Sequence, residues 1–374
     1  MTQRVYVGTR KGLFVWSRGS AGWTVEAVHF LGEPVTMLLV HPHGGTLYAV
    51  LTLGHFGAKL RRLRPGAQEW EECGVPVYPA GAEACDGPPQ GDGSQKKKPA
   101  SLVEIWSLEA GGRDEPGVLW AGTIPGGLFR STDQGQTWRL IESLWNRPER
   151  WRWFGGGKDD PGIHSICVDP RDSRRLVVGI SCGGVWHSPD AGGSWTCEGE
   201  GLRAEYMPPN LAHDPAIQDP HRLSRCSADP DTMWMQHHNG VFLSRDSGKS
   251  WRELKTARPA PFGFAVAAHP DDAKTAWFVP AATDQCRVPV DGGVVVSRTR
   301  DGGETFEVLS HGLPGRHAYD IVYRHALEVD RRGQSLAMGS TTGGFWVSEN
   351  EGEDWSCPSH TLPPVYCVRF GTTE

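Results

Sequence analysis

Short apolar runs recur along the whole chain, and residues that favour turns separate each run from the next. The clearest unit has apolar alternation over 163–170, further apolar runs over 175–181 and 184–188, and another segment after Trp195. Alternation of apolar and polar positions over about four to eight residues predicts half-buried strands, and the Gly, Pro and Asp residues between them predict tight connections. The pattern therefore predicts a four-stranded antiparallel sheet.

One short motif follows the third predicted strand of several units. It reads S/T-x-D-x-G-x-S/T before Trp or Phe at 131–138, 188–195, 244–251 and 299–306, and 348–355 has Asn350 in place of Asp. The final aromatic residues lie 49 to 57 positions apart. Asp accepts hydrogen bonds from backbone N–H groups in a tight turn, and Gly supplies a positive φ. We expect these Asp residues to hold turns rather than to act in catalysis.

The repeat predicts a closed ring of sheets. Further units align with the first, with innermost strands expected at 35–42, 104–110, 221–230, 262–270 and 318–324. The chain begins with the three outer strands of a unit and ends with 363–371, which fits the missing innermost strand. Pairing the two ends removes exposed sheet edges. The prediction is a single all-β domain over residues 1–374, a seven-bladed β-propeller closed by the C-terminal strand; six blades with a stray hairpin is the alternative.

The turn motif resembles the Asp-box, or BNR, repeat of the sialidase superfamily. The strings GTRKGLF (8–14), PGGLFRSTDQG (125–135), HDPAIQDPH (213–221) and QHHNG (236–240) are similar to those of seven-bladed Asp-box propellers labelled glycosyl hydrolase or exo-α-sialidase. The resemblance implies the fold and a functional face, but it names no reaction. Sialidases have six blades and an early Arg-Ile-Pro motif, whereas the nearest string here is Arg287-Val288-Pro289. We therefore do not expect sialidase activity.

Blade topology separates a structural face from a functional one. The Asp motif occupies the turns between third and fourth strands, so we expect function on the opposite face, at second-to-third-strand loops and blade crossings. Six of the 15 histidines fall there. Two long crossings, 139–163 and 196–221, are expected to wall a pocket. Residues 78–100, rich in Gly, Pro and charge, are expected to form a flexible insertion on this face.

Histidines from neighbouring blades suggest a divalent transition metal, because neutral imidazole suits Zn, Cu, Fe or Ni. The expected ligands are His55, His164, His221 and His237. The expected catalytic residues are His237, His238, Glu104 and Tyr206. No pair has the spacing of a known ligand motif, so these side chains could instead line a wet polar channel.

Positive charge on the same face suggests an anionic ligand. Arg10 and Arg287 could grip a carboxylate or phosphate, or could form salt bridges with Glu104 or Asp320. The full set expected to bind substrate is Arg10, Arg287, Trp106, Gln236 and Tyr319, in which an aromatic ring could stack on a sugar or could simply pack.

Composition limits the class of partner. A net charge of -6 and a pI near 6.2 argue against nucleic acid. No apolar stretch approaches the ~20 residues that span a bilayer. Nine cysteines without an apolar leader favour reduced thiols and the cytoplasm. We expect a small-molecule partner and no nucleotide cofactor, and a protein partner stays open.

Three functions remain open. The first is a hydrolase or lyase that acts on a small polar, anionic or glycan-like molecule, with a metal or a histidine base moving the proton. The second is a non-catalytic scaffold or assembly factor that uses one face to hold a partner. The third is a sensor that binds a small ligand in the same pocket.

Overall fold

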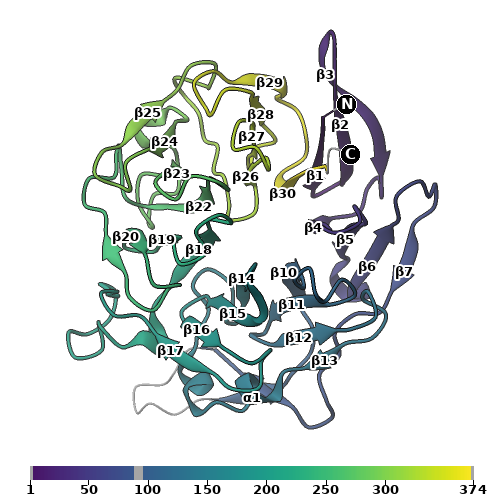
Figure 1. The fold of residues 1–374 in the computed structure, drawn as a ribbon, viewed down its shortest axis with the longest axis vertical. Coiled ribbons are helices and arrows are strands. Elements are labelled where there is room, and N and C mark those ends of the chain that lie inside the picture. Colours follow the sequence, from purple (N-terminus) through teal and green to yellow (C-terminus); the bar gives the residue numbers. More distant parts are fainter. Residues whose placement is uncertain (1–2, 88–95, 372–374) are drawn as a thin grey trace.

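The computed structural model describes residues 3–87 and 96–371, and it confirms the seven-bladed ring (Figure 1). Seven four-stranded antiparallel sheets surround a central axis. The blade that closes the ring contains β30 (Val365–Phe370), β1 (Arg4–Thr9), β2 (Gly12–Gly19) and β3 (Gly22–His29). The second blade contains β4 (Val35–Val40), β5 (Leu47–Thr52), β6 (Ala58–Leu63) and β7 (Glu71–Cys73). The third contains β10 (Glu104–Ala110), β11 (Leu119–Ile124), β12 (Leu128–Ser131) and β13 (Arg139–Leu140).

The remaining four blades repeat the same order. They comprise β14 (Ile163–Asp169), β15 (Asp172–Ile180), β16 (Gly184–Ser188) and β17 (Thr196–Glu198); β18 (Pro220–Arg225), β19 (Met233–His237), β20 (Gly240–Ser244) and β21 (Arg252–Glu253); β22 (Gly263–Ala268), β23 (Ala276–Pro280), β24 (Val296–Thr299) and β25 (Glu307–Leu309); and β26 (Leu327–Val329), β27 (Leu336–Gly339), β28 (Phe345–Ser348) and β29 (Ser356–Ser359). The helices are short: α1 (Glu142–Trp145), η1 (Gly54–Phe56), η2 (Pro148–Arg152), η3 (Pro215–Ile217) and η4 (Val290–Gly292). No helix in the described part of the chain has the length and apolar character needed to cross a membrane.

Ring closure joins the two ends of the chain. β30 pairs antiparallel with β1, from Val5 opposite Phe370 to Thr9 opposite Val365. Val365, Cys367 and Val368 are at most 1% exposed. The closing blade is therefore completed by one strand from the C-terminal end, as the sequence predicts.

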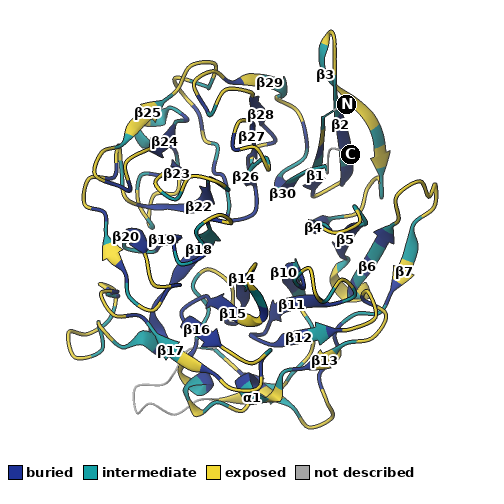
Figure 2. Cartoon of the chain, in the orientation of Figure 1, coloured by how far each residue is buried: buried dark blue, intermediate teal, exposed yellow. Residues whose placement is uncertain are grey.

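The core lies between neighbouring blades. Inner and middle strands are buried, and the outermost strands carry most of the exposed positions (Figure 2). A tryptophan is almost completely buried in each of five blades: Trp120, Trp186, Trp234, Trp277 and Trp346. Burying such large side chains between sheets fixes the spacing of the blades.

The repeated turns share one hydrogen-bond pattern. The Asp133 carboxylate accepts from the backbone N–H of Gln136 at 3.0 Å and of Thr137 at 2.9 Å, and from the Thr137 hydroxyl at 2.6 Å. The Asp246 and Asp301 carboxylates repeat all three contacts in their own turns. These carboxylates therefore serve the turns on the face opposite the functional one.

The structure corrects one strand. Residues 318–324 are predicted as an innermost strand, but the strand is β26, which begins three residues later at Leu327. Asp320 instead accepts hydrogen bonds from the hydroxyls of Ser340 and Thr342, which pulls this segment into a loop. Arg324 and the residue after it consequently lie in the turn that precedes β26.

Part of the predicted insertion is ordered by contacts. β8 (Glu83–Cys85) and β9 (Lys97–Pro99) pair as a hairpin, and Tyr78 is buried against Phe129 and Trp145. The Lys98 ammonium lies 2.8 Å from Asp160 on the long 139–163 crossing. Residues 88–95 of the segment lie outside the described part of the chain.

Candidate functional site

A cavity of about 390 Å³ opens at the axis on the face predicted to be functional, and we call it the mouth cavity. Its lining comes from blade crossings, second-to-third-strand loops and the starts of inner strands: Arg10, Pro34, Thr36, Thr52, Glu104, Trp106, Gly156, Gly157, Lys158, Phe264, Arg287, Tyr323, Arg324, His325 and Tyr366. Four residues predicted from the sequence therefore meet in one cavity: Arg10, Glu104, Trp106 and Arg287. Glu104 is ion-paired there with Lys158 at 3.0 Å.

Arg324 is the unusual group of this cavity. The residue is 8% exposed, and its guanidinium carbon lies 4.8 Å from the Trp106 ring centre and 5.5 Å from that of Phe264. Among the described residues it donates no hydrogen bond and has no carboxylate within ion-pair distance. Burial lowers the pKa of Arg324 below its ordinary value. An unpaired buried cation that faces a cavity is expensive for the protein unless something anionic occupies the cavity.

Two histidines lie buried near Arg324 with unused ring nitrogens. Neither nitrogen of His325 has a partner among the described residues, and His164 uses only Nδ1, 2.9 Å from the Ser165 hydroxyl. The edge of the Trp106 ring packs on His164, with ring centres 5.4 Å apart. Burial holds the pKa of both imidazoles well below the ordinary value, so both are neutral at pH 7.

A carboxylate and two imidazoles converge beside the mouth cavity, and we call Asp219, His221 and His238 the Asp219 cluster. His221 Nε2 lies 3.3 Å and His238 Nδ1 3.4 Å from the same oxygen, Asp219 Oδ2. The other oxygen accepts from the Cys182 backbone N–H at 3.1 Å and the Ser181 hydroxyl at 3.4 Å. Within residues 3–87 and 96–371, this is the one group of three or more His, Cys, Asp or Glu side chains whose ligand atoms lie within 4.8 Å of one another.

Electrostatic effects in the Asp219 cluster favour the ionised carboxylate. Burial raises the pKa of Asp219, but His221, His238 and Arg324 outweigh burial and hold it well below its usual range. Burial lowers the pKa of His238, yet the carboxylates of Asp219 and Asp284 raise it above the ordinary value. His221 is fully enclosed, and burial lowers its pKa. The cluster therefore combines a carboxylate with one imidazole that protonates readily and one that does not.

Three contacts connect the Asp219 cluster to the mouth cavity. Phe264 lines the cavity and stacks on the His221 ring with centres 4.8 Å apart. The loop before β24 carries both Asp284, whose carboxylate lies 3.5 Å from His238, and Arg287, which lines the cavity. Gly156 also lines the cavity, and a Cβ there would lie 2.9 Å from the Asp219 carboxylate, so only glycine lets the crossing pass this closely.

The other predicted residues contribute no side chain to the Asp219 cluster. His55 is exposed in η1 and contacts Phe56. His237 is buried and faces the backbone N–H groups of Asp219 at 3.2 Å and Asn239 at 3.1 Å. The Gln236 amide donates to three backbone carbonyls, and Tyr319 is 65% exposed. Of these residues, none is among those that line the mouth cavity.

Tyr206 lies beside the cluster rather than in it. Its hydroxyl donates to the Ile217 carbonyl at 2.9 Å, and its ring packs edge-on against His238 with centres 5.0 Å apart. The histidines predicted as ligands or catalytic residues thus fall into three groups. His221 and His238 belong to the cluster, His164 packs against Trp106 of the mouth cavity, and His55 and His237 do neither.

Sequence reasoning missed Asp219, Arg324 and His325. Asp219 stands two residues before His221 in the string HDPAIQDPH, so alternation at the start of β18 could have placed both side chains on one side. Arg324 was assigned to an ordinary strand, and nothing in its local pattern distinguishes it from a surface arginine.

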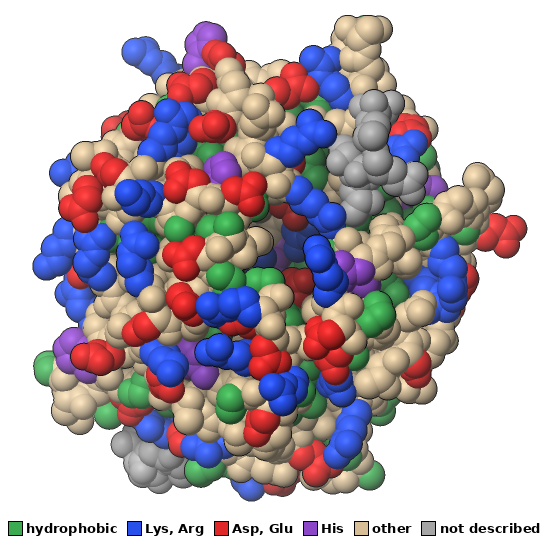
Figure 3. All heavy atoms as spheres, viewed as in Figure 1, with side chains coloured by type: hydrophobic (Ala, Val, Ile, Leu, Met, Phe, Trp, Pro, Cys, Tyr) green, Lys and Arg blue, Asp and Glu red, His purple; other side chains and the backbone are tan. Residues whose placement is uncertain are grey.

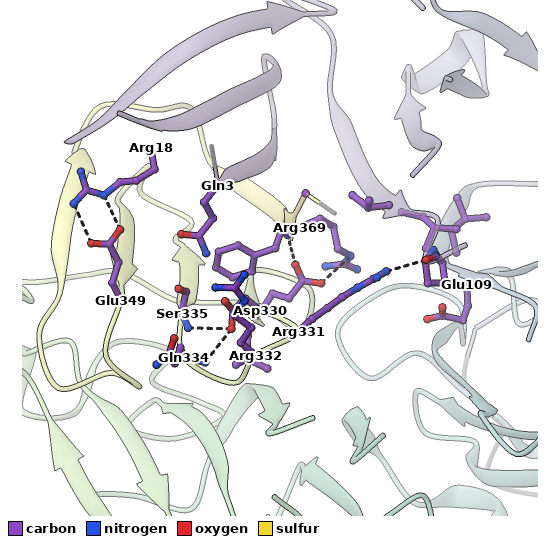
Figure 4. A pocket seen from close by; sticks show the side chains of 18 of the residues that line it. Gln3, Arg18, Glu109, Asp330, Arg331, Arg332, Gln334, Ser335, Glu349 and Arg369 are labelled. Carbon is purple, nitrogen blue, oxygen red and sulfur yellow. Dashed lines mark hydrogen bonds and ion pairs between the residues drawn. The ribbon is translucent and has the colours of Figure 1, made fainter. Parts of the chain in front are cut away.

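A second cavity of about 790 Å³ lies at the other end of the axis, and we call it the far-end cavity. The centre of the ring is hollowed, with acidic and basic side chains around the hollow (Figure 3). Arg18 and Glu349 face each other on one side at 2.6 Å, and Glu109 lies on the other (Figure 4). Arg369 lies 3.7 Å from Glu328. Two arginines of the far-end cavity, Arg18 and Arg369, therefore have a carboxylate partner, and a third, Arg222, donates to the His164 carbonyl at 3.3 Å, whereas Arg324 in the mouth cavity has neither kind of contact among the described residues.

Glu328 in the far-end cavity gives a pH prediction. Burial raises its pKa to about 7, although Arg369 and the Phe370 backbone N–H favour the ionised form. Because the folded-state value exceeds the ordinary 4.5, protonation stabilises the fold fully below pH 4.5, and this contribution disappears as the pH rises through 7. We expect Glu328→Gln to exceed the wild type in unfolding free energy by about 3 kcal/mol at pH 8 and to match it near pH 4.5. Urea unfolding at both pH values measures this difference, and an equal difference at both would contradict it.

Curated relatives match part of this chain. It is 24% identical over 282 residues to an oligoxyloglucan-reducing end-specific xyloglucanase of Emericella nidulans, a match covering 68% of this chain and 32% of the relative. It is 35% identical over 75 residues to the xyloglucanase Xgh74A of Acetivibrio thermocellus, covering 19% of this chain and 8% of the relative. The chain thus spans about a third of the first relative's length. No protein-family model matches.

Solved structures share the propeller fold. An ancestral GH74 enzyme aligns with a TM-score of 0.58 at 15% identity, over 86% of this chain and 38% of that one. The periplasmic gluconolactonase of Pseudomonas aeruginosa aligns with a TM-score of 0.55 at 14% identity, over 100% of this chain and 99% of that one. At such identities the likeness extends to the fold, and the site must be interpreted from its own residues.

Proposed function

We propose that this protein is a hydrolase that acts on a small carbohydrate-like molecule carrying an anionic group, bound in the mouth cavity. The observation that carries the proposal is the buried guanidinium of Arg324, which has no partner among the described residues and faces the cavity. An anion on this group would replace the hydration that burial removes.

The rest of the cavity suits such a molecule. Arg10 and Arg287 add positive charge to the wall, and the rings of Trp106 and Phe264 provide flat apolar surface. Hydroxyl groups of Thr36 and Thr52, further around the same wall, are suited to hydrogen bonds with a polyol. A volume of about 390 Å³ lies in the ordinary range for a small-ligand site.

The Asp219 cluster supports hydrolysis rather than binding alone. A carboxylate within 3.4 Å of two imidazoles, next to the cavity, is an arrangement that can activate water and move its proton. In hydrolysis the water oxygen forms a bond to the electrophilic carbon, the bond to the leaving oxygen breaks, and the proton released by water ends on that oxygen.

Similar proteins give independent support for this reaction class. The names of the relatives and of the solved propellers specify xyloglucanase and gluconolactonase activities for those proteins. The five repeated turns also fit the Asp-box of the sialidase superfamily, which we propose as the ancestry of the repeat. Sialidase activity is not part of the proposal, because the early Arg-Ile-Pro motif is absent from the sequence.

Chromogenic substrates test the proposal. We expect the protein to hydrolyse a 4-nitrophenyl uronide at a higher kcat/KM than the matching neutral glycoside. Arg324→Gln should lower kcat/KM for the uronide by tenfold or more, because hydrogen bonds to charged groups contribute roughly 1.5–3 kcal/mol. The matched control is Arg331→Gln, which removes the same charge from the far-end cavity.

The outcomes separate the possible functions. Equal rates for acidic and neutral substrates, or equal losses in the two variants, would contradict the role of Arg324. Tight binding of glucuronate without hydrolysis of either the α- or the β-linked uronide would contradict the hydrolase and would support a sensor that binds its ligand in the same pocket.

A further inference from the structure

We propose that Asp219, His221 and His238 bind one divalent transition metal ion of the zinc type, through one carboxylate oxygen and two imidazole nitrogens. This ligand set differs from the four histidines that the sequence predicts. The inference gives the proposed function its water-activating group, and only the reaction step rests on that function, because metal binding is measurable without substrate.

The spacing of the ligand atoms favours an ion between them. The two imidazole nitrogens lie 3.3 and 3.4 Å from Asp219 Oδ2, which is longer than the ~2.7–3.2 Å of ordinary hydrogen bonds. Zinc binds nitrogen and oxygen at roughly 2.0–2.1 Å, so two ligands of a tetrahedral ion lie about 3.3–3.4 Å apart. The observed separations match the edges of such a coordination shell.

The hydrogen-bond roles of His221 also favour an ion. Its Nδ1 lies 2.7 Å from the Gly263 carbonyl, which can only accept, so this nitrogen carries the ring proton. In the neutral ring Nε2 then has a lone pair, and it faces the carboxylate oxygen Asp219 Oδ2 at 3.3 Å. Two acceptors in contact repel one another, and a cation between them turns the contact into attraction.

His238 completes the same arrangement from the loop after β19. Its Nδ1 faces Asp219 and its Nε2 faces Asp284 Oδ2 at 3.5 Å. A carboxylate behind the second nitrogen of a metal-bound imidazole orients the ring and strengthens the ligand. A doubly protonated His238 is the competing explanation of these contacts, and it leaves the acceptor pair at His221 unresolved.

Each of the three side chains is fixed by contacts with the rest of the protein, independently of the proposed ion. Asp219 Oδ1 accepts from the Cys182 backbone N–H, His221 is fixed by Gly263 and Phe264, and His238 packs against Tyr206. The three residues come from the crossing before β18, from β18 itself and from the loop after β19, so one blade supplies the whole set. This rigidity is what a metal site needs to form without large rearrangement.

Three protein ligands leave a fourth position for water. A zinc-type ion lowers the pKa of bound water to about 7, which supplies hydroxide at neutral pH. His238 is the partly exposed member of the set, with a side chain 19% exposed, whereas Asp219 and His221 are enclosed. The site therefore has one partly exposed ligand, and Phe264 and the loop that carries Arg287 connect it to the mouth cavity.

Metal titration tests the inference directly. Tag-free protein, stripped with a chelator and dialysed, is titrated with Zn²⁺ by calorimetry and with Co²⁺ by visible absorption. We expect one equivalent of Zn²⁺ and the absorption of a four- or five-coordinate Co²⁺ ion. His238→Gln should weaken Zn²⁺ binding by 100-fold or more, whereas His55→Gln, an exposed histidine outside the cluster, should leave it unchanged.

A second variant guards against misfolding. Asp219→Asn keeps the size of the side chain and should remove the Co²⁺ absorption, with circular dichroism reporting whether the ring remains folded. Absence of Zn²⁺ binding by the wild type, or equal binding by wild type and His238→Gln, would overturn the inference.

The two proposals can fail separately. One bound equivalent of Zn²⁺ without turnover of any glycoside would support the metal site and contradict the hydrolase. Turnover that survives complete removal of the metal would support the hydrolase and contradict the role of the ion in activating water, whereas absence of Zn²⁺ binding in the titration would contradict the metal site itself.

Discussion

Arg324→Met is expected to make the protein more stable, by about 1–2 kcal/mol, while removing its affinity for anionic ligands. Arg324 is 8% exposed, and its guanidinium has no hydrogen-bond or ion-pair partner among the described residues, so the free energy of folding includes the cost of desolvating it. Contacts with Trp106 and Phe264 offset part of this cost, since a desolvated cation over a ring contributes about 2 kcal/mol. Urea unfolding without added anion measures the change.

Arg298→Met is the matched control, because Arg298 is equally enclosed but fully paired. Its guanidinium is 1% exposed and lies 2.7 Å from Glu307 and 2.5 Å from Glu353. Breaking these pairs should destabilise the protein by about 2 kcal/mol, less than for a fully buried pair because both carboxylates are half exposed. Opposite signs for the two substitutions are the expected result. A loss of stability in both variants would mean that Arg324 is part of the structural core.

Deleting residues 365–374 is expected to abolish the folded ring. The deletion removes β30, which pairs with β1 and buries Val365, Cys367 and Val368. Burial of three such side chains contributes roughly 5 kcal/mol or more, which is comparable with the whole stability of many domains. The loss also exposes the edge of β1 to intermolecular pairing. Circular dichroism and gel filtration should show an unfolded or aggregated chain.

Complementation distinguishes ring closure from a general effect of truncation. A synthetic peptide of residues 363–371, added during refolding, should restore a monomeric ring by pairing with β1. A truncated chain that folds cooperatively without the peptide would contradict the seven-bladed closure.

The fold follows from the sequence because its signals are local and repeated. Each strand shows apolar alternation, and each Asp turn satisfies its own backbone within a few residues, as Asp133 and Asp301 do. Closure also follows, since 363–371 has no other partner in the repeat. The misplaced strand at 318–324 shows the limit: Ile321 and Val322 are apolar and buried, but Asp320 bonds to a neighbouring loop that alternation cannot reveal.

The face of the site is predictable, but its contacts are not. Blade topology places Arg10, Trp106 and Arg287 around one mouth, and the structure brings them together. Which imidazoles meet depends on how the 196–221 crossing folds, and the sequence offers His237 and His238 as equals. Only the three-dimensional structure distinguishes them, because the His237 ring accepts a hydrogen bond from the backbone N–H of Asn239, whereas the His238 ring faces the Asp219 carboxylate.

The central claim is that the mouth cavity receives an anion at Arg324, next to the Asp219 cluster. Crystals soaked in sodium bromide and measured at the bromine absorption edge test it most directly, because bromide reports where an unpaired cation accepts an anion. The prediction is an anomalous peak in hydrogen-bond contact with the Arg324 guanidinium, absent from Arg324→Gln crystals. Bromide in the far-end cavity beside Arg222 with none at Arg324 would contradict it.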